Sequence, residues 1–202
     1  MKKQYLWFVV LGLLLAGCEL EQIPVSTTSK SAVFGSESGL QLYAYSFYSI
    51  LPQSNTRQDA MSDYLAVKTV PSFVQENAFS ATLSSGWDWG DLRNINYFLA
   101  NNNDPNVPEA VRKNYKGIAR FFRAYFYFNK VIRFGDVPWI GKPLDVADPE
   151  LYGGRDPRTL VMDSVLADIN YACENITLTN STTRSMVTKW VAYAFKARMC
   201  LF

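Results

Sequence analysis

The sequence has no histidine among its 202 residues. This absence excludes Ser-His-Asp and Cys-His nucleophilic systems and every metal site with a histidine ligand. Cysteine is scarce as well, with three residues in all, and their spacing forms neither a CxxC motif nor a zinc-binding pattern. The sequence therefore predicts no metal site and no cofactor.

The amino terminus lacks an apolar run long enough to span a bilayer comfortably. Residues 5–15 are apolar, follow two lysines, and lead into Leu15-Ala16-Gly17-Cys18. A positive segment, a short apolar segment and small residues before a cysteine are typical of a signal peptide that ends in a lipobox. We expect residues 1–17 to be removed and Cys18 to carry lipid, which would hold the protein on a membrane surface. A membrane anchor, or an ordinary secretory signal with a chance cysteine, is the alternative.

The mature chain would carry no excess of charge of either sign. Loss of residues 1–17 removes two lysines and no acidic residue, so 18 of the 20 Lys plus Arg remain against 18 Asp plus Glu. A neutral chain gives no reason to expect nucleic acid as a partner. Residues 18–35 are polar, with Pro24 and a cluster of Ser and Thr, and we expect them to form a tether.

Two cysteines remain once Cys18 is assigned. Cys173 and Cys200 could form a disulfide, or they could be two buried thiols that pack as small hydrophobic groups, and we favour the thiols.

Apolar residues make up 49% and aromatic residues 15% of the chain, which indicates a globular protein that can bury a core. The stretch of residues 113–139 predicts one long helix that Pro108 opens and Gly135 ends. Apolar residues almost encircle this helix between Phe121 and Phe128, so we place it at the centre of an all-α domain. A cationic stripe follows the same helix and is expected to be a solvated face or a set of ion pairs: Arg112, Lys116, Arg120 and Arg123.

Helical periodicity predicts four further helices, over residues 36–51, 87–102, 158–176 and 187–202. They should pack with the central helix as antiparallel pairs, weakly like tetratricopeptide repeats, with long irregular loops between them. The loop after Pro52 is expected to hold one short helix over residues 57–67. Trp139 and Trp190 are expected in the core. The apolar stripe of the last helix still runs at Phe202, which favours the amino-terminal part of a longer, here truncated, protein.

Four features together carry a family resemblance. They are the lipobox at Cys18, Arg93-Asn94-Ile95-Asn96, the run from Ala119-Arg120-Phe121-Phe122-Arg123 into Arg133-Phe134-Gly135-Asp136-Val137-Pro138, and Thr188-Lys189-Trp190 followed by Lys196-Ala197-Arg198. With them the chain resembles the SusD/RagB family of outer-membrane nutrient-binding lipoproteins from gut-type Bacteroidetes. The resemblance covers residues 18–202 and makes residues 36–202 an incomplete SusD-like amino-terminal helical domain.

The resemblance implies a lipid-anchored, surface-exposed protein of the outer membrane. Members of this family bind oligosaccharides, or sometimes peptides, without catalysis and sit as a lid on a TonB-dependent transporter of the SusC type. Their fold is mostly helical, with tetratricopeptide-like pairs as scaffold. Much of the binding surface comes from loops of the later half, which this chain lacks.

The resemblance also suggests a ligand-binding site. Members of the family often carry a ligand-stacking tryptophan in the region of Trp87, and we hypothesise that Trp87 stacks on a sugar ring. Arg57, Asp63 and Asn94 are its possible polar neighbours. The alternative is that Trp87 only caps a helix and packs on the scaffold.

The residues alone are compatible with two other functions. The paired helices would also allow a helical-repeat scaffold that binds only proteins. A surface glycoside hydrolase would need two carboxylates, for which the candidates are Asp88, Asp91, Asp136 and Glu150. These four form no recognisable constellation, and Asp88 with Asp91 is explained by the start of a helix.

Overall fold

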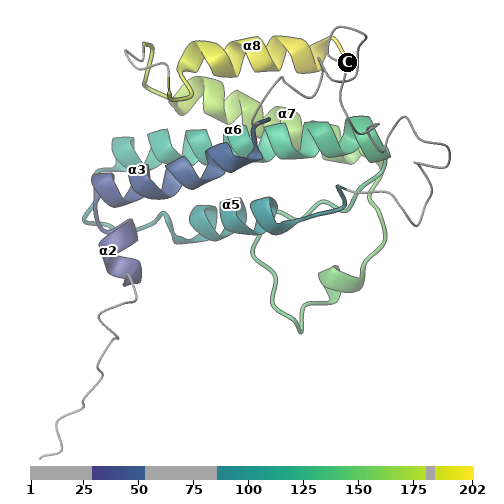
Figure 1. The fold of residues 1–202 in the computed structure, drawn as a ribbon, viewed down its shortest axis with the longest axis horizontal. Helices are drawn as coiled ribbons and strands as arrows, with labels where there is room; N and C mark the ends of the chain where they lie inside the picture. Colours follow the sequence, from purple (N-terminus) through teal and green to yellow (C-terminus); the bar gives the residue numbers. More distant parts are fainter. Residues whose placement is uncertain (1–28, 53–85, 181–184) are drawn as a thin grey trace, which may run out of the picture.

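The long helix α6 (Glu109–Phe134) runs through the middle of the molecule in the computed structural model, which describes residues 29–52, 86–180 and 185–202 (Figure 1). It follows Pro108, which itself has no backbone N–H that would need a partner there. It ends at Gly135, whose φ of 69° is a conformation that glycine adopts without strain. The amide of Gly135 donates to the Val131 carbonyl at 2.9 Å, which closes the last turn. The predicted central helix is confirmed.

Helix α5 (Gly90–Asn101) lies antiparallel to α6 on one side of it. Asn102 at the end of α5 donates from Nδ2 to the Arg112 carbonyl near the start of α6, at 2.9 Å. At the opposite end, Lys130 of α6 reaches the Asp88 carbonyl just before α5. The helix begins at Gly90 rather than at Trp87 as predicted, so both Trp87 and Trp89 precede it.

Helices α7 (Arg158–Asn175) and α8 (Lys189–Cys200) pack on the other side of α6 (Figure 1). A Cβ at Gly117 of α6 would meet the Ile176 side chain at 3.1 Å, so the start of α6 lies against the end of α7. Phe195 of α8 contacts three rings of α6, each with centroids 5.5 Å away: Phe121, Tyr125 and Phe128. The bounds of α7 and α8 agree with the predicted helices to within two residues at each end.

Two predictions for α8 are wrong. Trp190, expected in the core, is 62% exposed, because the buried stripe of the helix consists of Ala192, Phe195 and Met199. Cys200, expected to be buried, is exposed and follows that stripe by one position, while Cys173 of α7 is buried. Neither cysteine forms a disulfide, so the two remain free thiols.

The amino-terminal part of the described chain is more structured than predicted. Residues 30–34, assigned above to the tether, form the short helix α2 (Lys30–Phe34), and Phe34 is buried. The predicted helix over 36–51 divides into α3 (Glu37–Tyr45) and the 3₁₀ helix η1 (Ser46–Ile50). Ser36 caps α3 through Oγ, which accepts from the Gly39 amide at 3.1 Å. Residues 18–28 lie outside the described part.

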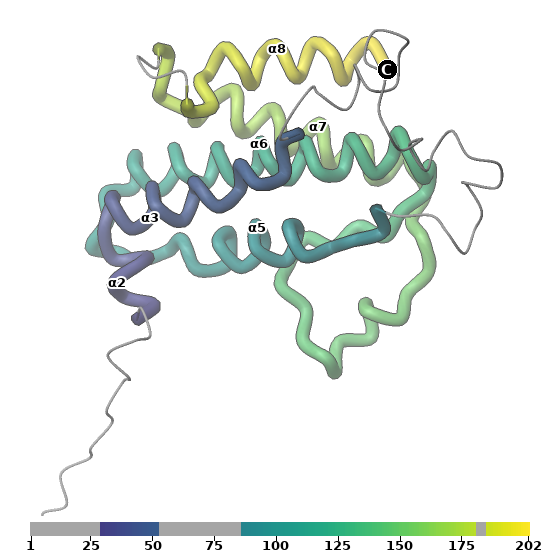
Figure 2. The backbone as a smooth tube through the Cα atoms, viewed as in Figure 1, coloured from purple at the N-terminus to yellow at the C-terminus, as the bar shows by residue number. Residues whose placement is uncertain are grey.

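A long loop joins α6 to α7 and swings out beside α5, as Figure 2 shows. It contains the 3₁₀ helix η3 (Pro149–Tyr152), and its two ends meet in a bridge between Val137 and Asp156. The all-α prediction is confirmed, since the described residues form helices and no β-sheet. The tetratricopeptide-like detail stays a prediction, and the short helix expected over residues 57–67 lies outside the described residues. Within residues 29–52, 86–180 and 185–202 no helix combines the length and hydropathy that crossing a bilayer requires.

Candidate functional site

The segment of residues 86–89 presents two tryptophans where the chain enters α5. Trp87 is 42% exposed, whereas Trp89 is partly buried against the core. The two indoles meet edge to face with centroids 5.2 Å apart, and Trp87 meets the Phe134 ring in the same way at 4.9 Å. Two edge-to-face contacts of this kind favour one orientation of the Trp87 ring.

Lys130 of α6 holds the backbone on both sides of Trp87. Its ammonium group donates to the Gly86 carbonyl and, at 2.7 Å, to the Asp88 carbonyl. It also lies 5.3 Å from the Trp89 ring centroid and 4.8 Å from that of Phe126. Burial among these groups lowers the pKa of Lys130, and the nearby Asp88 carboxylate acts against that shift. The lysine therefore fixes the segment that carries Trp87.

Arg155 from the loop before α7 covers part of the Trp87 indole. The carbon at the centre of its guanidinium group lies 4.7 Å from the ring centroid. This is a cation–π distance, and arginine is well suited to it because its planar group stacks while its N–H groups stay in the plane. Trp87 thus has an arginine on its face and aromatic rings around it.

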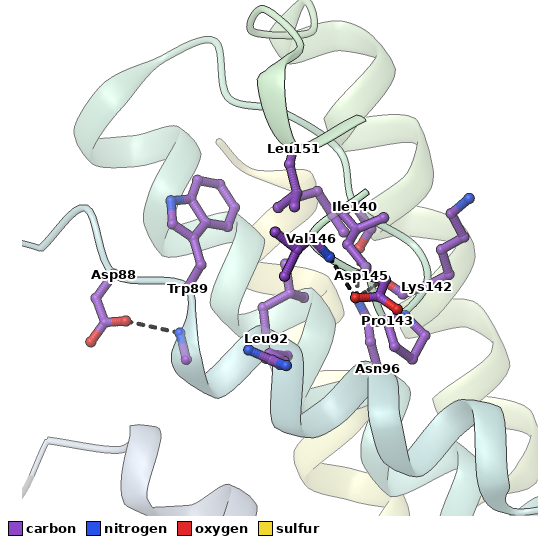
Figure 3. A pocket seen from close by; sticks show the side chains of 13 residues that line it. Asp88, Trp89, Leu92, Asn96, Ile140, Lys142, Pro143, Asp145, Val146 and Leu151 are labelled. Carbon is purple, nitrogen blue, oxygen red and sulfur yellow. Dashed lines mark hydrogen bonds between the residues drawn. The ribbon is translucent and has the colours of Figure 1, made fainter. Parts of the chain in front are cut away.

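A cavity of about 420 Å³ opens beside Trp89, between α5 and the loop before α7. Trp89 and Leu92 form the α5 side of it, and Ile140, Val146 and Leu151 form the loop side (Figure 3). Asp88 lies at its edge, where its Oδ1 accepts from the Gly90 amide at 2.8 Å. The volume suits a small molecule or one residue of a chain ligand, with mostly apolar walls.

A buried ion pair holds the loop that forms this cavity wall. Arg123 of α6 donates to Asp168 of α7 from Nε at 2.6 Å and from Nη2 at 2.8 Å. Its Nη1 donates to Asn96 Oδ1 at 3.1 Å and to the Gly141 carbonyl at 3.0 Å. Asn96 in turn donates to the Ile140 carbonyl at 2.8 Å. The guanidinium group therefore connects α5, α6, α7 and the loop.

Of the two expectations for the cationic stripe, a solvated face or a set of ion pairs, the second holds for Arg123, but the pair is not a surface one. The Arg123 side chain is 8% exposed and that of Asp168 is 4% exposed, so the pair is an internal one. Arg120 lies 3.5 Å from the same carboxylate and 4.3 Å from the Tyr171 ring centroid. The sequence analysis did not include Asp168. Its place on the buried stripe of α7, beside Val165 and Ile169, is the signal that would have identified it.

Tyr127 and Trp139 complete the support of the loop. The Tyr127 hydroxyl oxygen accepts from the Ile140 amide at 2.7 Å, and its ring lies 4.4 Å from that of Trp139. Tyr127 is fully buried, and burial raises the pKa of its phenol. Trp139, expected in the core, is half-buried and lies over Arg123, with 5.3 Å from its ring centroid to the guanidinium carbon.

The structure describes two of the four predicted ligand-binding residues, Trp87 and Asn94, and does not bring them together. Trp87 and Asn94 have different neighbours, because the Asn94 amide faces α3 and η1. Its Oδ1 accepts from the Tyr43 hydroxyl at 2.7 Å, and its Nδ2 donates to Ser46 Oγ at 2.8 Å. Arg57 and Asp63 lie outside the described residues, as does the lipidation residue Cys18. The sequence analysis missed Lys130 and Arg155. For Lys130 a signal was present, because its spacing of four residues from both Phe126 and Phe134 places it on the aromatic face of the helix.

Three of the four candidate carboxylates of a hydrolase have a local partner. Asp88 accepts from the Gly90 amide, Asp136 accepts from the Arg158 amide at 2.9 Å, and Glu150 pairs with Lys142 at 3.1 Å. Asp91 lies in the first turn of α5, where a negative charge is favourable. In the part of the chain that the structure describes, no three Cys, Asp or Glu residues are grouped as a metal would require.

Comparison with known proteins gives a consistent result. A family model described as "SusD-like_3: Starch-binding associating with outer membrane" matches residues 20–201. A curated relative, SusD-like protein P2 of Formosa agariphila, is 25% identical over 224 residues, which cover 100% of this chain and 43% of the relative. The crystal structure of a SusD-like protein from Bacteroides fragilis has the same fold, with a TM-score of 0.61 and 21% identity over 89% of this chain and 37% of that one. The chain thus spans less than half the length of these relatives.

Proposed function

The chain belongs to the SusD-like family, and we propose from that premise that it is a non-catalytic lipoprotein that binds an oligosaccharide, or another nutrient, at the outer membrane. In this proposal it delivers the ligand to a TonB-dependent transporter of the SusC type. The family description, with its starch binding and outer-membrane association, supports the ligand class and the location.

The observation that carries ligand binding is the exposed and fixed indole of Trp87. Sugar rings have one face of C–H groups that packs well on an aromatic ring, while their hydroxyls stay in water or meet polar groups. Trp87 is 42% exposed, and Trp89, Phe134, Arg155 and the Lys130-bound backbone hold it. A ring that is already ordered loses little freedom on binding, which favours affinity.

Replacement of Trp87 by alanine tests this proposal. We expect affinity for the bound glycan to fall about tenfold or more, which corresponds to about 1.4 kcal/mol. Maltoheptaose and a printed panel of neutral and acidic oligosaccharides serve as probes. Trp190→Ala on α8 is the matched control, because Trp190 is also an exposed tryptophan but lies on another helix. An unchanged affinity in Trp87→Ala, with an unchanged melting temperature, would contradict the proposed site.

The lipid anchor at Cys18 is part of the same proposal. It rests on the order of lysines, apolar run and small residues before Cys18. The Cys18→Ala variant should lose metabolic labelling with palmitate, whereas the unchanged protein should be labelled and should sediment with outer membranes. A labelled protein in the inner membrane would contradict the location and leave the anchor in place.

A protein-binding scaffold is the second candidate, and one observation favours it. Helix α8 exposes Trp190, Val191 and Tyr193, at 62%, 44% and 44%. Exposed aromatic residues on one helix are typical of protein-binding surfaces. A chain that binds no member of the glycan panel, yet binds a protein partner in a way that Trp190→Ala abolishes, would support this function instead.

A further inference from the structure

The guanidinium group of Arg155 has no anionic partner in the described part of the chain. Among residues 29–52, 86–180 and 185–202 the ion pairs join other residues. Its one hydrogen bond to the described residues is from Nη1 to the Asp136 carbonyl at 3.5 Å, the outer limit of such a bond. The residue is exposed and is held by its stacking on Trp87 at 4.7 Å. Most of its N–H groups therefore point to solvent.

The carboxylates next to Arg155 are engaged by backbone amides. Asp156 accepts from the Trp139 amide through Oδ2 at 2.7 Å, and Asp136 accepts from the Arg158 amide through Oδ1 at 2.9 Å. These two carboxylates thus stabilise the backbone of the loop and of the start of α7. This arrangement leaves the positive charge of Arg155 available beside the Trp87 indole.

A second arginine lies at the same segment. A methyl group at Gly86 would lie 2.6 Å from Nη1 of Arg133, so this guanidinium group is next to the backbone that precedes Trp87. Asp88 and Asp91 lie on this side as well, and Asp88 Oδ1 accepts from the Gly90 amide at 2.8 Å. It is Arg155, at 4.7 Å from the ring centroid, that lies on the face of the indole itself.

We propose that Trp87 and Arg155 form a subsite for an anionic sugar residue, a uronic acid or a sulfated sugar. This inference rests on the proposed function and names the ligand class for the Trp87 site. The sugar ring packs on the part of the indole that Arg155 leaves exposed. The carboxylate or sulfate group binds to the in-plane N–H groups of Arg155, which match two oxygen atoms of such an anion. No covalent step is involved.

Pairs of ligands that differ only in the anion test the proposal. Oligogalacturonides and their methyl esters test the carboxylate, and dextran sulfate oligomers and dextran test the sulfate. We expect the full chain to bind at least one acidic member about tenfold more tightly than its neutral partner, and this preference should decrease as salt rises. The Arg155→Gln variant should lose the preference and keep its weak affinity for the neutral partner. Arg158→Gln removes the same charge three residues away, in the first turn of α7, and should keep the preference.

Three outcomes would overturn the inference and leave the proposed function in place. They are equal affinity for the acidic and neutral partners, a preference that persists in Arg155→Gln, and a loss in Arg155→Gln that is the same for both partners. The last result would show that Arg155 only positions Trp87. Failure of the unchanged chain to bind any acidic or neutral glycan of the panel would contradict the proposed function itself and, with it, the inference.

Discussion

Arg123 and Asp168 form two parallel hydrogen bonds, of 2.6 and 2.8 Å, inside the interface between α6 and α7. Both side chains are more than nine-tenths buried. Removal of one partner from such a pair leaves the other charge buried without compensation, which costs more than the pair contributes over an apolar replacement. The pair is therefore a sensitive point of the fold.

The Asp168→Asn variant should lose roughly 3 kcal/mol or more of unfolding free energy, because it leaves the Arg123 charge unpaired. Urea unfolding followed by circular dichroism measures this change. The double variant Arg123→Met with Asp168→Leu should be more stable than either single variant. Glu109→Gln is the control, since Glu109 and Lys113 form an exposed pair at 2.8 Å, and it should change little. Additive single and double effects would show that the two charges are not coupled.

Lys130 and Trp87 should be coupled in ligand binding although Lys130 is not exposed to the ligand. The Lys130→Met variant removes the donor to the Gly86 and Asp88 carbonyls, which frees the backbone on both sides of Trp87. We expect it to reduce glycan affinity and to lower stability by about 1–3 kcal/mol.

A double-mutant cycle measures this coupling. In the Trp87→Ala background, Lys130→Met should have little further effect on affinity, because its effect on binding acts through the indole. A full, additive loss of affinity in the double variant would show that Lys130 acts at another place. The stability loss, measured separately by thermal unfolding, should be nearly the same in both backgrounds.

The two carboxy-terminal thiols should react at very different rates. Cys200 is exposed, whereas Cys173 is buried and burial raises the pKa of its thiol. A thiol reagent such as a maleimide should modify Cys200 within minutes and Cys173 only on unfolding. The Cys200→Ser variant should lose the fast phase, and Cys173→Ser should keep it. A disulfide between them would instead protect both residues until a reductant is added.

Periodicity was sufficient to place most of the helices. The bounds of α7 follow from its apolar stripe, and Gly135 ends α6 because its backbone needs a positive φ. The apolar pattern of a helix did not show which of its residues would be buried. Trp190 belongs to an apolar helix, yet the three residues that face the core are Ala192, Phe195 and Met199. When the apolar stripe of a helix is wider than the surface that neighbouring helices cover, the residues at its edge stay exposed.

The site could be predicted only in part, because its partners are distant in the sequence. Arg123 and Asp168 are 45 residues apart, so no local pattern joins them. Arg155 lies in a loop rich in Pro and Gly, and its place over Trp87 depends on the path of that loop. By contrast, the family resemblance pointed to Trp87 at the entry to α5, and its role in ligand binding stays a prediction.

The alkaline stability of the protein should depend on Tyr127. This phenol is fully buried, and burial raises its pKa above the usual value of about 10. Below pH about 10 both the folded and the unfolded state keep the proton, and the phenol adds no pH dependence. Above it the unfolded state loses the proton first, so the unfolded state binds fewer protons and the free energy of unfolding falls as pH rises.

The Tyr127→Phe variant separates this contribution from that of other groups. It should be less stable by about 1–2 kcal/mol near neutral pH, because the Ile140 amide loses its acceptor at 2.7 Å. Between pH 10 and 12 its stability should fall less steeply than that of the unchanged protein, so the two curves should converge. Lys116 and Lys130, whose pKa values burial lowers, have the opposite slope and are the same in both proteins. Urea midpoints measured at each pH give the two curves, and parallel curves up to pH 12 would show that the phenol ionises equally well in the folded state.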